Sequence, residues 1–250
     1  MIKLENTEVL GWEAAIRGMR NPMNSWEKSD SDWFDIQEWN TPPDEENYKW
    51  VKEGQCDFCY AVGPNDQDLM MRLAKAGSVD AKYRRMIVVT VDITAPLYWW
   101  KEFDTYKVGT VANSCSTMHK IHSKEFTEDD FSSEHLMRLA ERYENGITTP
   151  ISIYNNNGDG FSPVGVLHTT IDMLNLCREK FLETKDKRYW WQMIQLLPSS
   201  YNQRRTVMLN YEVLAGIYPK RKDHKLDEWH DFCDWIKSLP YSEIITLEEV

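Results

Sequence analysis

A run of small and hydroxyl-bearing residues at positions 109–117, with the sequence GTVANSCST, has side chains suited to a polar ligand. Such a run packs no core, and it follows an expected helix, where binding sites are often built. Lys107, just before the run, offers a positive charge that can bind a phosphate. His119, just after it, could carry a proton near neutral pH. Neutral hydrogen bonds would come from Thr110, Asn113, Ser114 and Ser116.

The segment before this run predicts a strand followed by a helix. Residues 86–93 are apolar or β-branched at nearly every position, which is typical of a strand largely covered on both faces. Ala95-Pro96 ends the strand, because proline cannot donate to a sheet but suits the first turn of a helix. Trp99, Phe103 and Tyr106 then recur at helical spacing. We therefore expect a helix over 97–107 whose end presents the polar run.

The composition argues against a long polyanion as partner. The 250 residues are 42% hydrophobic and 12% aromatic, enough for a sizeable core in one large domain or two small ones. Forty acidic against 29 basic residues give a formal charge of −11, whereas a nucleic acid polymer needs a basic surface. A small nucleotide needs only a few local cations. No stretch approaches the length of a spanning helix and no signal peptide is legible, so we expect a cytoplasmic protein without membrane contact.

The rest of the chain predicts further helices and one insertion. A strand is expected at 2–10, with helices at 13–19, 66–76, 127–144, 169–184, 203–218 and 226–236. Asp66 and Gly77 are the expected cap and stop of the helix at 66–76. Turns are expected at 145–146 and 155–160. The helix at 203–218 rests on four residues at helical spacing, Val207, Tyr211, Leu214 and Tyr218.

Residues 24–63 are acidic, carry scattered tryptophans and Pro42-Pro43, and show no period. We interpret them as an insertion in a single domain over 1–250. A surface excursion that packs its tryptophans on the core is favoured over a substrate lid. The segment also contains Cys56 and Cys59, a lone C-x-x-C without the further ligands that a structural zinc site needs. We therefore expect no metal.

The order of strand, Ala-Pro, aromatic helix and polar loop resembles the flavin-dependent thymidylate synthases. In that family the helix leads into Arg-His-Arg-x-x-Ser-x-Asn-x-x-Ser-x-Arg. Counted from Ala95-Pro96, this motif falls on 105–117, where Lys107 and Thr110 keep the chemical character. A one-residue shift aligns Asn113 and Ser116 with the family's Asn and Ser. A flavin-holding pattern of the family falls on 78–85, where three cations could face a phosphate or form a solvated patch: Lys82, Arg84 and Arg85.

A second block of resemblance covers 197–240. Family members have a Leu-Pro, a helix with an Asn, an Arg about eleven residues on, and a His. Asn210, Arg221 and His224 follow Leu197-Pro198 in that order here. The resemblance implies cofactor contacts for Asn210, His224 and Arg205, with Arg221 a phosphate-binding cation beside Lys107. Arginine suits that role because its planar guanidinium donates two parallel bonds.

The resemblance implies a fold and an activity. The implied fold is α+β, with a mostly antiparallel sheet packed by long helices, assembled as a homotetramer with sites between subunits. The implied activity is methylation of dUMP to dTMP by a folate one-carbon donor and reduced FAD, with NADPH as a possible co-substrate. Residues 107–119 would then face 210–224 across a cleft. The alternative is a homologue that binds nucleotide or flavin without catalysis, or an oligomeric scaffold that kept only the fold.

Overall fold

The computed structural model describes residues 2–35, 58–138, 140–144, 147–151, 153–154 and 160–248. Contacts within the chain divide it into two compact units. The sheet unit contains Ile2–Thr94, Phe103–Asn113 and Arg204–Val250, and the helical unit contains Met1, Ala95–Glu102 and Ser114–Gln203. The expectation of one domain with an insertion stays a prediction. No helix in the described part is long and apolar enough to cross a membrane.

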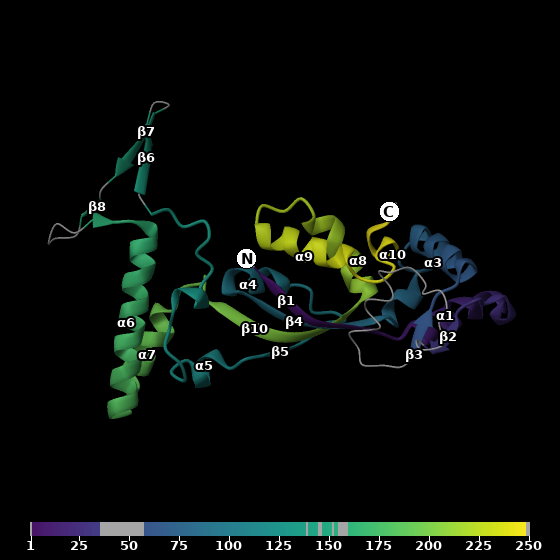
Figure 1. Ribbon diagram of the computed structural model, residues 1–250, viewed down its shortest axis with the longest axis horizontal. Coiled ribbons are helices and arrows are strands. Elements are labelled where there is room, and N and C mark those ends of the chain that lie inside the picture. Colours follow the sequence, from purple (N-terminus) through teal and green to yellow (C-terminus); the bar gives the residue numbers. More distant parts are fainter. Residues whose placement is uncertain are drawn as a thin grey trace. The chain divides into compact units, whose positions relative to one another are not determined.

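A four-stranded sheet is the main element, and the expected mixture of helices and antiparallel sheet is confirmed. Its strands are β1 (Lys3–Leu10), β4 (Val88–Pro96), β10 (Asn202–Asn210) and β5 (Val111–Ser114), in the order β1-β4-β10-β5. β1 runs antiparallel to β4, with Leu4 opposite Ile93. Helices α8 (Tyr211–Arg221) and α9 (Asp227–Lys237) lie along the sheet, and the short α10 (Glu243–Thr246) follows them (Figure 1).

The expectation that β4 is covered on both faces is wrong for the described chain. Val89, Val91 and Ile93 are fully buried, whereas the alternate residues Thr90 and Asp92 are only half-buried. Successive side chains of a strand point to opposite faces, so one face of β4 builds the core and the other remains partly open. The two polar residues that interrupt the apolar run mark this open face.

A polar network centred on Asp92 occupies the open face. Its carboxylate accepts hydrogen bonds from the Thr206 hydroxyl at 2.5 Å, the Arg204 guanidinium at 2.7 Å and the Asn6 amide at 2.9 Å. These bonds, led by that from Thr206, lower the pKa of Asp92 to about 2. The network joins β1, β4 and β10 through polar side chains.

The first helices of the sheet unit are α1 (Trp12–Arg20) and α3 (Pro64–Ala76). Gly77 ends α3 as expected, but Asp66 does not cap it, because the helix begins at Pro64 and the cap position is Gly63. Short 3-10 turns lie at η1 (Asn21–Met23), η2 (Trp26–Lys28) and η4 (Lys82–Arg85).

Asp66 instead forms the centre of a buried ionic cluster. Its side chain is 0% exposed and meets the buried Arg20 guanidinium at 2.5 Å. The hydroxyls of Ser29 and Ser31 donate to the same carboxylate at 2.7 and 2.6 Å, and the Asp30 backbone N–H donates at 3.1 Å. Burial raises the pKa of Asp66, but these bonds outweigh it, so the pKa lies below its usual value. The cluster fixes residues 29–31 to α1 and α3.

The expected insertion begins and ends in a separate two-stranded sheet. β2 (Asp32–Asp35) pairs antiparallel with β3 (Phe58–Ala61), and Trp33 lies opposite Tyr60. The Trp33 indole is half-exposed and donates to Glu13 of α1 at 3.1 Å. Residues 36–57, which include Pro42-Pro43 and Cys56, lie outside the described residues.

The expected helix over 203–218 is wrong, because the segment divides into β10 and α8. Along β10, Val207 and Leu209 are buried while Thr206 and Met208 are exposed, which is the alternation of a strand with one face on the core. Pairing within the sheet therefore overrides the helical spacing that Val207 shares with the later residues. The closing helix expected at 226–236 is confirmed as α9.

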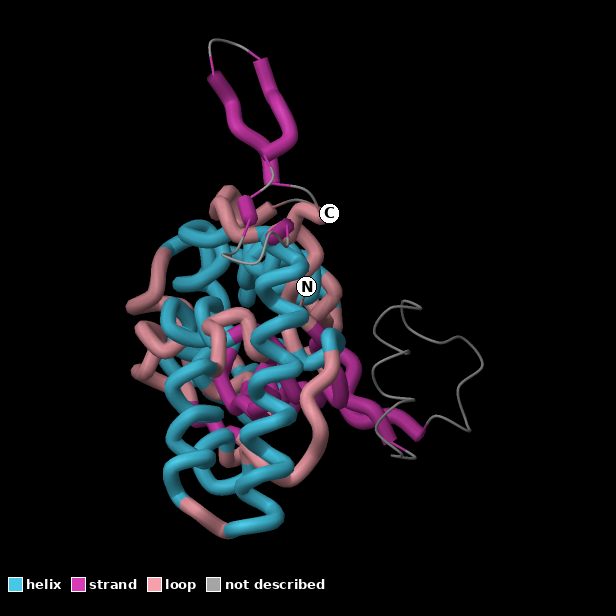
Figure 2. The backbone as a smooth tube through the Cα atoms, turned by 90° about the vertical axis from the view of Figure 1, so that its left-hand side faces the viewer, coloured by secondary structure: helices cyan, strands magenta, loops and turns pink. Residues whose placement is uncertain are grey.

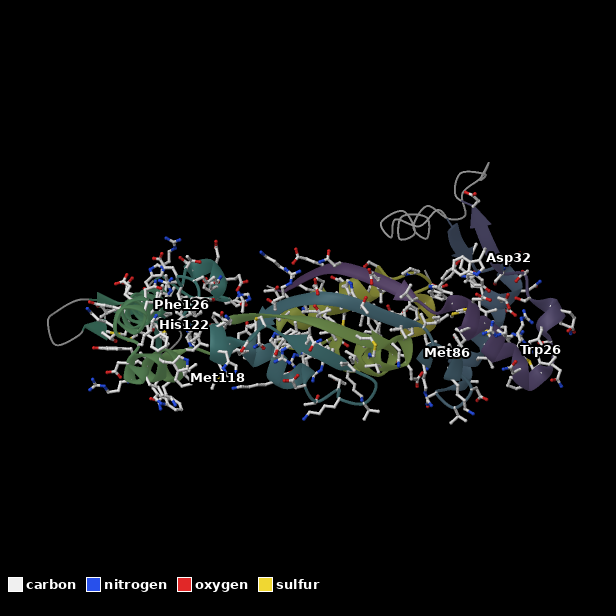
Figure 3. The ribbon with its side chains drawn as sticks, turned by 90° about the horizontal axis from the view of Figure 1, so that it is seen from below. Trp26, Asp32, Met86, Met118, His122 and Phe126 are labelled. Atoms are coloured by element: carbon white, nitrogen blue, oxygen red, sulfur yellow. The ribbon has the colours of Figure 1, made fainter. Side chains whose placement is uncertain are left out.

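The helical unit is built around α6 (Pro163–Thr184) and α7 (Lys187–Leu196), which lie side by side (Figure 1; Figure 2). Ser162 caps α6 by accepting from the Gly165 N–H at 3.0 Å, so this helix starts earlier than expected. His122 and Phe126 lie beside this pair (Figure 3). The buried cluster consists of Ile121, Phe126, Phe131, Leu167, Ile171, Leu174, Cys177 and Met193.

The expected helix over 127–144 is also wrong. The structure has a 3-10 turn, η5 (Glu128–Asp130), and then a hairpin of β6 (Ala140–Glu144) and β7 (Ile147–Ile151). Thr127 and Asp130 exchange hydrogen bonds at η5, so the acidic residues start one turn rather than a helix. β8 (Ile153–Tyr154) pairs with β9 (Gly160–Phe161). The turn expected at 145–146 lies outside the described residues, as do residues 155–159 of the turn expected at 155–160.

Candidate functional site

The loop that follows α4 (Leu97–Phe103) forms a hollow with α8 in the sheet unit. The hollow has a volume of about 310 Å³. One wall is the loop segment 105–108, and the other is one side of α8. Its lining residues are Thr105, Tyr106, Lys107, Val108, Glu212, Val213, Gly216 and Lys220.

The loop is held at both of its ends. α4 is shorter than expected and ends at the buried Phe103, whose carbonyl accepts from the Tyr106 N–H at 3.0 Å. The Phe103 ring stacks on Trp229 of α9 with ring centres 6.4 Å apart. At the other end Gly109 has φ +79°, and a Cβ there would lie 3.0 Å from a methyl carbon of Val213. Glycine therefore lets the loop run directly against α8.

The opposite wall depends on how α8 begins. Asn210 is the N-cap, and its side-chain oxygen accepts from the Val213 N–H at 3.0 Å. Gly216, one turn further along the helix, is exposed, and a Cβ there would meet nothing within 4 Å. There is therefore free space next to Gly216 on the side of α8 that lines the hollow.

Two lysines supply positive charge at the hollow that a ligand could meet. Lys107 and Lys220 are exposed, one on each wall, and neither has an ion-pair partner among the described residues. Glu212 also lines the hollow, but Arg84 pairs with its carboxylate at 2.8 Å. Arg84 is buried and also donates to the Ile244 carbonyl at 3.0 Å. It therefore neutralises Glu212, and it neither faces a phosphate nor lies in a solvated patch.

Arg221, the expected phosphate cation, lies against aromatic rings. Its Nε donates to the Tyr106 hydroxyl at 2.8 Å, and its guanidinium lies 4.3 Å from the centre of the Trp229 ring. His224 is nearby, with its ring centre 6.2 Å from that of Trp229. Its Nδ1 accepts from the Leu226 N–H at 3.1 Å, so this atom is unprotonated in that arrangement.

The other expected site residues of the sheet unit have separate surroundings. Arg205 pairs with Asp104 at 2.7 Å and is mostly buried. The Thr110 hydroxyl oxygen is buried and has no hydrogen-bond partner in the described chain. Asn113 is exposed on β5.

The remaining expected residues, Ser114, Ser116 and His119, belong to the helical unit. Ser116 caps the short helix α5 (Thr117–Lys120) by accepting from the His119 N–H at 3.2 Å. All three residues are exposed. Of the expected residues, Lys107 alone is among those that line the hollow in the described chain.

Tyr106, Glu212, Gly216 and Lys220 were missed as site residues. Tyr106 was counted on the apolar face of the helix expected at 97–107. A helix expected over 203–218 hides the other three, because it assigns Asn210 to the interior and stops before Lys220. Asn210 is a common N-cap residue, and a helix started there would have placed Glu212, Gly216 and Lys220 on one side at i, i+4 and i+8. The described residues contain no group of three His, Cys, Asp or Glu that could hold a metal ion.

Comparisons with known proteins find a likeness in fold alone. No protein-family model matches the chain, and no curated protein matches its sequence. Thymidylate synthase X from Helicobacter pylori, solved with FAD and dUMP, matches with a TM-score of 0.59 and 14% identity over 99% of this chain and 98% of that chain. A second structure of the Helicobacter pylori flavin-dependent enzyme, also with FAD and dUMP, gives 0.58 and 14% over 99% and 97%.

A UMP/dUMP methylase, PolB from Streptomyces cacaoi, bound with 5-Br dUMP, matches with a TM-score of 0.53 and 12% identity. The match covers 99% of this chain and 94% of that chain. Structural matches at such low sequence identity establish the architecture of the chain and leave its chemistry open. The chain therefore has the fold of the flavin-dependent thymidylate synthases.

Proposed function

We propose that this protein binds a uridine mononucleotide in the hollow, with dUMP the first candidate. The observation that carries the proposal is the presence on opposite walls of two lysines, Lys107 and Lys220, that have no ion-pair partner among the described residues. The solved structures that share the fold contain dUMP or a brominated dUMP. A phosphate monoester is the part of such a ligand that two ammonium groups would hold.

The electrostatics of the hollow favour an anion despite the acidic chain. The formal charge is −11, yet Glu212, the one carboxylate that lines the hollow in the described part of the chain, is neutralised by Arg84. Lysine binds phosphate as a point charge and lacks the paired donors of arginine. We therefore expect affinity for the phosphate that falls as salt rises, with weaker geometric selection than an arginine fork would give.

The size of the hollow favours a mononucleotide over a dinucleotide. About 310 Å³ is at the lower end of ligand sites, which commonly occupy about 300–1,000 Å³. Whole FAD does not fit such a hollow, so these residues do not form a flavin site by themselves. Methylation of dUMP to dTMP with FAD, folate and NADPH stays a prediction from the resemblance, as does the homotetramer. A cytoplasmic location stays a prediction from the sequence.

Calorimetric titration with dUMP and with deoxyuridine tests the proposal. If the lysines hold the phosphate, dUMP binds at least about tenfold more tightly than deoxyuridine, and the difference shrinks at high salt. Equal affinity for the two ligands, or no binding of either, would contradict the proposal.

The visible spectrum of the purified protein separates an enzyme from a binding protein. Bound flavin would make the protein yellow, and dUMP methylation would then be assayed directly. A colourless protein that binds dUMP is the second candidate, a homologue that binds nucleotide without catalysis. The engagement of Arg221 by Tyr106 and Trp229 favours this candidate, because the guanidinium is already occupied.

A further inference from the structure

Arg221 joins three elements of the sheet unit that are distant in sequence. It is the last residue of α8, and it bonds to Tyr106 in the loop after α4. Its guanidinium also lies over the ring of Trp229 in α9, which is fully buried. A planar cation stacked on a buried indole has little freedom to turn toward another ligand.

Tyr106 connects Arg221 to the hollow. Tyr106 lines the hollow, whereas Arg221 is not among its lining residues in the described chain. The Tyr106 ring also meets Trp229 edge-on, with centres 6.1 Å apart. Its backbone N–H closes the turn to Phe103 at 3.0 Å. The Tyr106 ring is thus held by its contact with Trp229, and its hydroxyl is held by the hydrogen bond from Arg221.

We propose that Arg221 is a positioning residue, which fixes the Tyr106 wall of the hollow and does not bind the nucleotide phosphate. Losing its bond to Tyr106 frees the loop that carries Lys107, and the two walls no longer keep a fixed separation. The binding part of this inference rests on the proposed function. The effect on the loop does not, because it is present without any ligand.

The side chain of glutamine supplies a sharp test. Its Nε2 lies the same number of bonds from the backbone as the arginine Nε, the atom that donates to Tyr106. Arg221→Gln therefore keeps the donor and removes the charge, whereas Arg221→Ala removes both. Positioning predicts dUMP affinity within about threefold of wild type for Gln and at least about tenfold weaker for Ala. A phosphate ligand predicts that both variants lose affinity alike, and that result would overturn the inference.

Deoxyuridine and the Tyr106 variant give a second readout. Positioning predicts that Arg221→Ala weakens deoxyuridine as well as dUMP, because the whole loop wall is freed and not only the lysine that meets the phosphate. It also predicts that Tyr106→Phe weakens dUMP and that Arg221→Ala adds nothing to it, since both act through one bond. A loss confined to dUMP, with Tyr106→Phe unchanged, would identify Arg221 as a phosphate ligand.

Hydrogen exchange in the absence of ligand separates this inference from the proposed function. Arg221→Ala should speed exchange of the amides at 105–109 by about tenfold or more. Arg72→Ala, which removes an exposed helical arginine paired with Asp68, should leave them unchanged. Faster exchange without dUMP binding would leave positioning standing and the proposed function contradicted. Unchanged exchange in folded Arg221→Ala, or in Tyr106→Phe if the first variant does not fold, would overturn positioning.

Discussion

Two sets of charged side chains in the sheet unit differ in what surrounds them. Arg20 and Asp66 are buried, and the Asp66 carboxylate accepts hydrogen bonds from one guanidinium, two hydroxyls and a backbone N–H. Lys107 and Lys220 are exposed on a hollow and have no ionic partner among the described residues. The first set has no capacity left for a ligand, whereas the second can meet one without breaking a bond.

The comparison shows why charge alone does not identify a binding site. A buried ion pair loses hydration that only its own partners can replace, so it contributes to one arrangement of the chain. An exposed ammonium keeps its water and exchanges it for a phosphate at little cost. Arg221 lies between these cases, since it is partly exposed but engaged by Tyr106 and Trp229.

Asp66→Ala should produce the largest effect and would break the first member of the comparison. It leaves the Arg20 guanidinium buried without its carboxylate, so the free energy of unfolding should fall by about 3–5 kcal/mol. Denaturant titration measures this loss. Arg17→Ala, which removes an exposed pair with Glu13, is the control and should cost less than about 0.5 kcal/mol. Similar losses in the two variants would contradict the structural role of Asp66.

Two glycines beside the hollow provide a matched pair with effects of opposite sign. Gly109→Ala strains a left-handed backbone and presses on Val213, so stability should fall by about 1–2 kcal/mol and dUMP should bind more weakly. Gly216→Ala meets open space in a helix and should raise stability by up to about 1 kcal/mol. Thermal unfolding of both variants checks the prediction. A stabilising Gly109→Ala would mean that the loop does not lie against α8.

The Asp92 network should contribute to the loss of stability in acid. Because its folded pKa is about 2 and its unfolded value is 3.8, its contribution is complete above pH 3.8 and is lost as pH falls toward 2. Discounted for its contact with solvent, we expect about 1 kcal/mol. Asp92→Asn should therefore lower stability at pH 7 and flatten the curve between pH 4 and 2. An unchanged acid limb in the variant would exclude Asp92 as its cause.

The smallest effects are expected from the exposed lysines of the hollow, and they test whether these lysines are free to bind a ligand. Lys107→Ala and Lys220→Ala should each weaken dUMP binding by about 0.5–1 kcal/mol, less so at high salt, with stability unchanged. Lys75→Ala, at an exposed helix end away from the hollow, serves as the control. If Lys75→Ala weakens dUMP equally, the effect reports net charge and not a site.

The sequence predicted correctly those elements whose apolar residues recur at a spacing that fits only one kind of secondary structure. β1, α3, α6 and α9 were found because their apolar residues recur at the spacing of one structure. The segment from Val207 to Tyr218 was misread because one strand residue and three helix residues fall by coincidence at intervals of four, three and four, and all are buried. Only the pairing of β10 between β4 and β5 reveals the strand, and such pairing depends on distant residues.

The site was predictable at the level of segments and not of residues. The polar character of 105–117 and the spacing after Asn210 indicated two segments, and the structure places Lys107 and α8 around one hollow. That Arg221 turns to Tyr106 could not be foreseen, since it depends on where Trp229 packs. Lys220 could not be chosen over other lysines until the start of α8 was known.

The discontinuity of the sheet unit has a consequence for its formation during synthesis. Tyr106 and Arg221 are 115 positions apart, and Arg84 and Glu212 are 128 apart, so the walls of the hollow come from stretches made at very different times. A nascent chain that ends before Asn202 lacks β10 and α8 and exposes the apolar face of β4. Folding of this unit therefore waits until β10 and the helices that follow it have left the ribosome, and until then the apolar face of β4 is open to aggregation.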